Sequence, residues 1–121
     1  MTRDGDVVTL HLRRVTAYQA LGDLEEAEAA VFLAMMTDQA NPWVHKAMGD
    51  LLRARGSLPA AQKAYERALK LAPDLPDLYF GLGIALWEQG KRTEAQEKFS
   101  RYLELAPYGQ QAEEAREYLA P

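Results

Sequence analysis

The stretch DLYFGLGIALWEQG, residues 77–90, has apolar residues on more than one side of its predicted helix. One set has the 3, 1, 3 spacing of a single buried helix face: Tyr79, Leu82, Gly83 and Leu86. A second set is spaced 4 and 3 and lies about 100° around the same helix: Phe80, Ile84 and Trp87. The stretch therefore predicts a helix that is buried on two sides.

The chain matches itself when it is shifted by 34 residues, which places this helix in a repeat. Glycines recur at Gly22, Gly56 and Gly90, and alanines at Ala27, Ala61 and Ala95. Gly49 aligns with Gly83, Pro42 with Pro76, and Pro73 with Pro107. Unrelated helices of a bundle would not share one register in this way, so the spacing indicates a helical repeat.

Each unit contains two predicted helices separated by a glycine, whose positive φ can close the first helix. Pro42 and Pro76 stand at the predicted start of a helix pair, where a missing N–H costs nothing, and Asn41 is a predicted N-cap. Pro73 and Pro107 follow the second helix of a pair and stop it.

This pattern resembles the tetratricopeptide repeat (TPR) family, whose unit reads W-x2-L-G-x2-Y, then A-x3-F, then P. Residues 76–109 match it best, 42–75 match well, and 8–41 are a degenerate copy. Residues 110–120 carry an apolar stripe with polar residues elsewhere and predict a solvating capping helix. The resemblance implies an all-α fold over residues 1–121, a single TPR domain built as a right-handed α-solenoid of three helix pairs plus the C-terminal capping helix.

Composition excludes several classes of function. The 121 residues carry a net charge of −4, without the lysine and arginine clusters of a nucleic-acid-binding protein, and no apolar run is long enough for a membrane span. The absence of cysteine excludes disulfides and thiolate metal sites. His11 and His45 are the same position of consecutive repeats, which favours a packing role over a metal site. No nucleophile stands next to a base, so we expect neither enzymatic activity nor a cofactor.

The N-terminal sequence lacks the plan of a signal peptide, which favours a cytoplasmic location, although a piece of a larger or exported protein would look the same.

The resemblance also implies a partner-binding surface, the concave groove lined by the first helix of each pair. By register, the candidate groove residues are Leu12, Thr16, Trp43, Lys46, Asp50, Arg53, Asp77, Phe80, Ile84 and Trp87. In the family's carboxylate clamp, Lys, Asn and Arg occupy set groove positions. Those positions here hold Leu12, Thr16, Ala47, Asp77 and Gly81, which disfavours the C-terminal tails of Hsp70 and Hsp90 as ligands.

These observations predict a protein-interaction module or scaffold that binds a peptide or helix of unknown identity in its groove. The sequence leaves three explanations open for the second apolar set, Phe80, Ile84 and Trp87: docking of a partner, homodimerisation, or internal packing under the C-terminal helix. A structural scaffold that self-associates and a fragment of a longer repeat array remain alternative functions. A targeting module beside a catalytic domain is a third.

Overall fold

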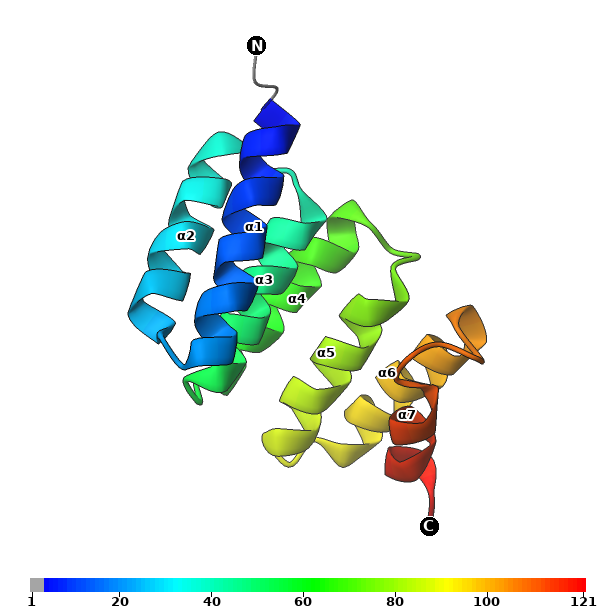
Figure 1. Cartoon of the computed structure of the whole chain (residues 1–121). Helices are drawn as coiled ribbons and strands as arrows, with labels where there is room; N and C mark the ends of the chain where they lie inside the picture. The colour runs from blue at the N-terminus through cyan, green and yellow to red at the C-terminus, as the bar shows by residue number, and fades with distance from the viewer. Residues whose placement is uncertain (1–3) are drawn as a thin grey trace.

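The computed structural model describes residues 4–121, with side chains from residue 7 onward. This part of the chain is helical and contains seven helices (Figure 1). They are α1 (Asp4–Leu21), α2 (Leu24–Thr37), α3 (Pro42–Ala54), α4 (Leu58–Leu71), α5 (Pro76–Glu88), α6 (Arg92–Leu105) and α7 (Ala112–Leu119). The first six helices form three antiparallel pairs that stack side by side, and α7 packs on α6 (Figure 1). The predicted all-α solenoid is confirmed.

The turns within the pairs repeat one hydrogen-bond geometry. Gly22, Gly56 and Gly90 have φ values of 78°, 80° and 84°. The residue after each glycine donates its N–H to a carbonyl five residues earlier, as Asp23 does to Tyr18 at 2.8 Å. This is the hydrogen bond that a left-handed residue makes possible at the C-terminus of a helix. The predicted role of these glycines is therefore confirmed.

The helix boundaries also follow the local sequence. Pro42 and Pro76 are the first residues of α3 and α5. The side chain of Asn41 accepts the N–H of Trp43 at 2.9 Å, which confirms the predicted N-cap. The helices α4 and α6 end two residues before Pro73 and Pro107 respectively.

A side-chain hydrogen bond recurs at the repeat spacing and explains His45. His45 Nε2 donates to the carbonyl of Gln39 at 2.8 Å, and the Tyr79 hydroxyl, 34 residues later, donates to the carbonyl of Pro73 at 2.7 Å. Each bond ties the first helix of a unit to the end of the preceding unit. His45 therefore has the structural role that the repeat predicts.

Close approach of the paired helices depends on glycine. A Cβ atom built on Gly83 would lie 2.8 Å from the Phe99 ring, and one built on Gly49 would lie 2.8 Å from the Tyr65 ring. Both rings are fully buried and belong to the second helices of the second and third pairs. The two pairs are thus packed in the same way, with a large aromatic ring against the helix backbone at a glycine.

The C-terminal helix covers the last pair as a cap. Ala112 and Ala115 of α7 are buried, and Tyr118 stacks on Phe99 with ring centroids 4.4 Å apart. Tyr102, which replaces the alanine of the other units, is buried, and its hydroxyl accepts the N–H of Gln111 at 3.0 Å. The larger side chain is accommodated because it helps to anchor the start of α7.

Candidate partner-binding groove

A groove runs across the inner helices α1, α3 and α5, where the repeat predicted a binding surface. It consists of two adjoining pockets of about 480 and 170 Å³ that share Gln19, Lys46 and Asp50. The larger pocket lies mainly between α3 and α5 and reaches Gln110 and Gln111 ahead of α7. The smaller pocket lies between α1 and α3.

Eight of the ten candidate residues line these two pockets. They are Leu12, Thr16, Trp43, Lys46, Asp50, Arg53, Asp77 and Phe80. Because they come from three different helices, only the repeat register places them on one surface. The remaining two, Ile84 and Trp87, line neither pocket.

The groove has an apolar end and a polar end. Apart from Thr16 and the three residues that it shares with the larger pocket, the smaller pocket is lined by Leu12, Val15 and Ala47 beside Trp43, which is 43% exposed. The larger pocket is bordered mostly by charged and amide side chains. A ligand that crosses α3 therefore meets an indole first and charged groups afterwards.

A hydrogen-bonded network organises the polar end. Lys46 Nζ lies 2.9 Å from Asp50 Oδ2, and the Tyr65 hydroxyl donates to the other oxygen of the same carboxylate. The Arg53 side chain also interacts electrostatically with Tyr65. Asp50 is thus held by two donors, and its charge is shared between a lysine and a buried phenol.

The pKa values in this network follow from burial and neighbouring charges. Burial raises the pKa of the Tyr65 phenol far above its ordinary value, the Asp50 carboxylate adds to the rise, and Arg53 opposes it. Burial alone would lower the pKa of Arg53, but its interaction with Tyr65 and the charges of the Asp50 and Glu88 carboxylates raise it. The phenol therefore stays protonated, and the guanidinium stays charged.

Tyr65 enters the groove from behind, because it belongs to α4 and passes between the backbones of α3 and α5. A Cβ atom on Gly49 of α3 would lie 2.8 Å from its ring, and one on Gly81 of α5 would lie 2.6 Å from it. The ring thus fills the space between two glycines. This arrangement carries the hydroxyl through to Asp50.

Two charged side chains of the larger pocket make no ion pair within residues 7–121. Arg53 Nε is buried and has no hydrogen-bond partner, and Asp77 makes no ion pair or hydrogen bond within residues 7–121. Both side chains line the larger pocket. The Arg53 guanidinium and the Asp77 carboxylate therefore offer one positive and one negative group to a ligand in this pocket.

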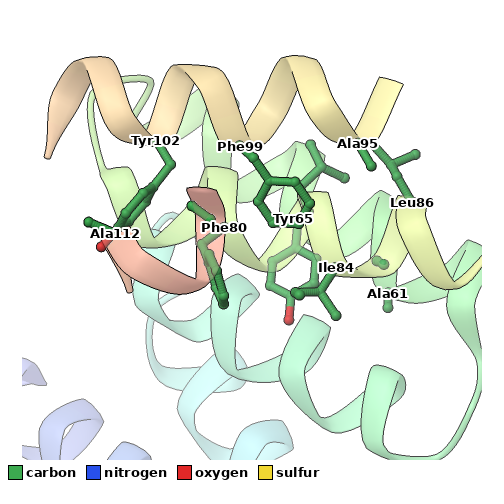
Figure 2. Packing of buried hydrophobic residues seen from close by; sticks show 12 residues of the cluster. Ala61, Tyr65, Phe80, Ile84, Leu86, Ala95, Phe99, Tyr102 and Ala112 are labelled. Atoms are coloured by element: carbon green, nitrogen blue, oxygen red, sulfur yellow. The ribbon is translucent and has the colours of Figure 1, made fainter. Parts of the chain in front are cut away.

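Of the three explanations left open for Phe80, Ile84 and Trp87, the burial of the first two supports internal packing. Phe80 is 7% exposed and Ile84 5% exposed. The Phe80 ring lies 5.7 Å from those of both Phe99 and Tyr102, and Figure 2 shows the three side chains below the ribbon of α6. Internal packing is therefore the explanation that holds for Phe80 and Ile84.

Trp87 is partly buried by the capping helix. Its ring meets that of Tyr118 edge-on, with the centroids 5.0 Å apart, and the Arg92 guanidinium lies 5.0 Å from the indole. The second apolar face of α5 is thus occupied by α6 and α7. A helix in the last pair needs this extra surface because it also carries the cap.

Sequence reasoning missed Tyr65, Gln110 and Gln111. Tyr65 lies on an outer helix, which the groove pattern does not include, and only Gly81 signalled a ring at that point. Gln110 and Gln111 belong to the connection before α7, whose course depends on tertiary packing. The bulky Tyr102 was the available signal, since its hydroxyl holds Gln111 in place.

Neither a metal centre nor a membrane span occurs in the described part of the chain. No group of three or more histidine or acidic side chains there is arranged to hold a metal ion, and none of the described helices combines the length and apolar character needed to cross a bilayer.

Comparison with known families identifies the repeat. One family model, described as a TPR repeat, matches residues 49–90, and a second, described as a tetratricopeptide repeat, matches residues 76–108. The degenerate first unit lies outside both matches but folds as a helix pair like the others. No curated protein matches the chain.

Solved structures share the fold. The chain is similar to a Thermobaculum terrenum O-GlcNAc transferase mutant, with 24% identity and a TM-score of 0.86 over 93% of this chain and 22% of that one. Pseudomonas aeruginosa pilF matches with 18% identity and a TM-score of 0.88, over 96% of this chain and 52% of pilF. The first TPR domain of Spaghetti (RPAP3), bound to an HSP90 peptide, matches with 22% identity and a TM-score of 0.83, over 93% and 90%.

At these identities the likeness establishes the fold alone. The chain spans less than a quarter of the transferase and about half of pilF.

Proposed function

We propose that this chain, which belongs to the tetratricopeptide repeat family, is a non-enzymatic protein-interaction module that binds a peptide or a helix in its concave groove. The observation that carries the proposal is the meeting of eight register-predicted residues, from Leu12 to Phe80, in one groove. These side chains combine an exposed indole with charged groups that make no ion pair within residues 7–121. Such a combination suits the binding of a ligand.

The groove indicates the chemistry of the ligand. A hydrophobic side chain fits the apolar end beside Trp43, and a carboxylate fits the polar end beside the Arg53 guanidinium, which makes no ion pair within residues 7–121. Asp77 is free to accept from a backbone N–H or a basic side chain. The expected ligand is an extended or helical segment in which an apolar residue is followed by an acidic one.

This chemistry differs from capture of a chain terminus. Leu12, Thr16 and Ala47 occupy clamp positions and line the smaller pocket, while Asp77 and Gly81 line the larger one. A carboxylate at Asp77 would be repelled. The solved Spaghetti complex holds an HSP90 peptide in a TPR domain of the same fold. It supports the use of a TPR groove for peptides, but we propose a different ligand for this one.

A display library of linear peptides tests the proposal. Peptides selected on the wild-type protein are expected to share an apolar residue followed by an acidic one. Their affinity, measured by fluorescence anisotropy, is expected to fall at least tenfold for Trp43→Ala and for Arg53→Ala. Lys70→Ala, on the exposed outer face of α4, is the matched control and is expected to bind as the wild type does. Selected peptides that bind all four proteins equally would place the interaction outside the groove.

A further inference from the structure

The outer face of α2 is apolar at positions where the other outer helices are charged or polar. Phe32, Leu33 and Met36 are 55%, 47% and 76% exposed, and Ala29 beside them is exposed as well. We call these four residues the α2 stripe. The corresponding residues are Glu66, Arg67, Lys70 and Lys63 in α4, and Ser100, Arg101, Glu104 and Glu97 in α6. The fold itself therefore does not require apolar residues at these positions.

The geometry of the α2 stripe suits a helix. Phe32 and Met36 form one ridge with i, i+4 spacing, and Ala29 and Leu33 form a second ridge beside it. A partner helix can lay its own side chains between such ridges, and the small Ala29 leaves room for one of them. The stripe is about 12 Å long, so roughly two to three turns of a partner helix cover it.

Charge selects among the possible occupants. Between Arg14 and Lys46 the chain has no lysine or arginine but five acidic residues: Asp23, Glu25, Glu26, Glu28 and Asp38. Glu25 and Glu26 are exposed at the N-terminal end of the stripe and make no ion pair within the described residues. Only Glu28 is paired, with Arg55 at 2.7 Å. The sequence around the stripe is therefore acidic, and only one of its five carboxylates is in an ion pair within the described residues.

This charge disfavours a second copy and a membrane as occupants. A second copy would bring the same acidic rim to the contact, and an anionic bilayer would be repelled by it. The exposed apolar area of the stripe also disfavours a dimer. At about 200 Å² for each whole side chain, the three large residues expose only about 350 Å², well below the roughly 800 Å² per partner of a standard interface.

We propose that the α2 stripe is a second interaction surface, separate from the groove, and that it binds an amphipathic helix with an apolar stripe and a lysine- or arginine-rich rim. The apolar side chains of the partner pack between Phe32, Leu33 and Met36, and its basic rim pairs with Glu25 and Glu26. The two surfaces lie on opposite layers of the solenoid, because the groove is built by α1, α3 and α5 and the stripe belongs to the outer layer. One chain can thus hold two partners at once.

A designed helix library provides the test. Its 18-residue peptides carry fixed leucines at i, i+3, i+4 and i+7, and each rim position is varied among lysine, glutamate and glutamine. We expect selection on the wild-type protein to enrich lysine at the rim. The best peptide is expected to lose at least tenfold affinity for Phe32→Glu/Leu33→Arg/Met36→Lys, which installs the α4 residues on α2. It is expected to keep its affinity for Lys70→Ala.

A second variant separates loss of packing from change of charge. Phe32→Ala/Met36→Ala leaves the net charge unchanged and is also expected to weaken binding at least tenfold. Circular dichroism should show wild-type helicity for both variants, because every substituted side chain is exposed.

Each remaining outcome overturns the proposal. Selection of glutamate rims, no rim preference, no binding above background, or equal binding to the triple variant would do so. A concentration-dependent dimer in light scattering that the triple variant dissolves would assign the stripe to self-association. Binding to phosphatidylglycerol vesicles that the triple variant abolishes would assign it to a membrane.

Discussion

Replacement of Gly81 by alanine is expected to destabilise the protein, although alanine is the better helix former. In an open helical position Gly→Ala stabilises by about 1 kcal/mol. At this position the new Cβ would lie 2.6 Å from Tyr65 Cε1 and 2.8 Å from Cζ, about 1 Å inside normal contact. The ring has little room to move, because it is fully buried and the backbone at Gly49 is equally close, with a built Cβ there 2.8 Å from Cε1.

The magnitude follows from three contributions. Overpacking of a buried site costs about 2 kcal/mol, and displacement of the Tyr65 hydroxyl from Asp50 adds about 1 kcal/mol. The helix propensity of alanine offsets about 1 kcal/mol of this. The net loss is about 2 kcal/mol, which lowers the melting temperature by roughly 6–12 °C in a chain of this length.

Urea denaturation followed by circular dichroism measures this loss, and a double-mutant cycle isolates its cause. In a Tyr65→Leu background the ring is absent, so Gly81→Ala is expected to stabilise by about 1 kcal/mol. The change in the free energy of unfolding caused by Gly81→Ala thus has opposite signs with tyrosine and with leucine at position 65. A Gly81→Ala protein more stable than the wild type, or the same loss in both backgrounds, would refute the packing of Tyr65 between two glycines.

Three further predictions concern single contacts. Asn41→Ala removes the N-cap of α3 and should lower the free energy of unfolding by about 1 kcal/mol in urea denaturation, whereas an unchanged midpoint would contradict the cap. Trp87→Ala should lower the free energy of unfolding by about 2 kcal/mol in the same assay, because the indole packs on Tyr118. It should leave the affinity of the groove for a peptide unchanged. A loss of affinity without a loss of stability would contradict this. Tyr65→Phe should make the protein less sensitive to alkaline pH. The pKa of the Tyr65 phenol is raised in the folded state, so its contribution to the free energy of unfolding is complete below pH about 10. That contribution declines above this pH, because the phenol ionises in the unfolded chain. Melting temperatures of both proteins from pH 8 to 11 measure this, and parallel curves would contradict it.

The fold could be predicted from the sequence because the same turn and helix-end residues recur in the repeat units. Three glycines, the prolines at the helix starts and ends, and the Asn41 cap act locally, and each is used in the structure as predicted. The groove followed from the same register, since the position of a residue in a unit decides which face it occupies.

What could not be predicted depends on tertiary packing. The spacing of Phe80 and Ile84 predicted a second buried face but not what buries it; the rings of Phe99 and Tyr102 in α6 cover Phe80. Tyr65 was missed for a different reason. A residue of an outer helix reaches the inner face only through a gap, and that gap exists because two glycines from different units face one ring.

Chemical-shift mapping shows whether the groove across α1, α3 and α5 binds a peptide. Titration of the isotopically labelled protein with a selected apolar–acidic peptide should perturb backbone amides around Gln19, Trp43, Lys46 and Arg53, together with the Arg53 Nε–H resonance that has no partner in the free protein. Amides on the outer faces of α2, α4 and α6 should stay unchanged. Perturbations confined to those outer faces, with the Arg53 side chain unaffected, would contradict the account.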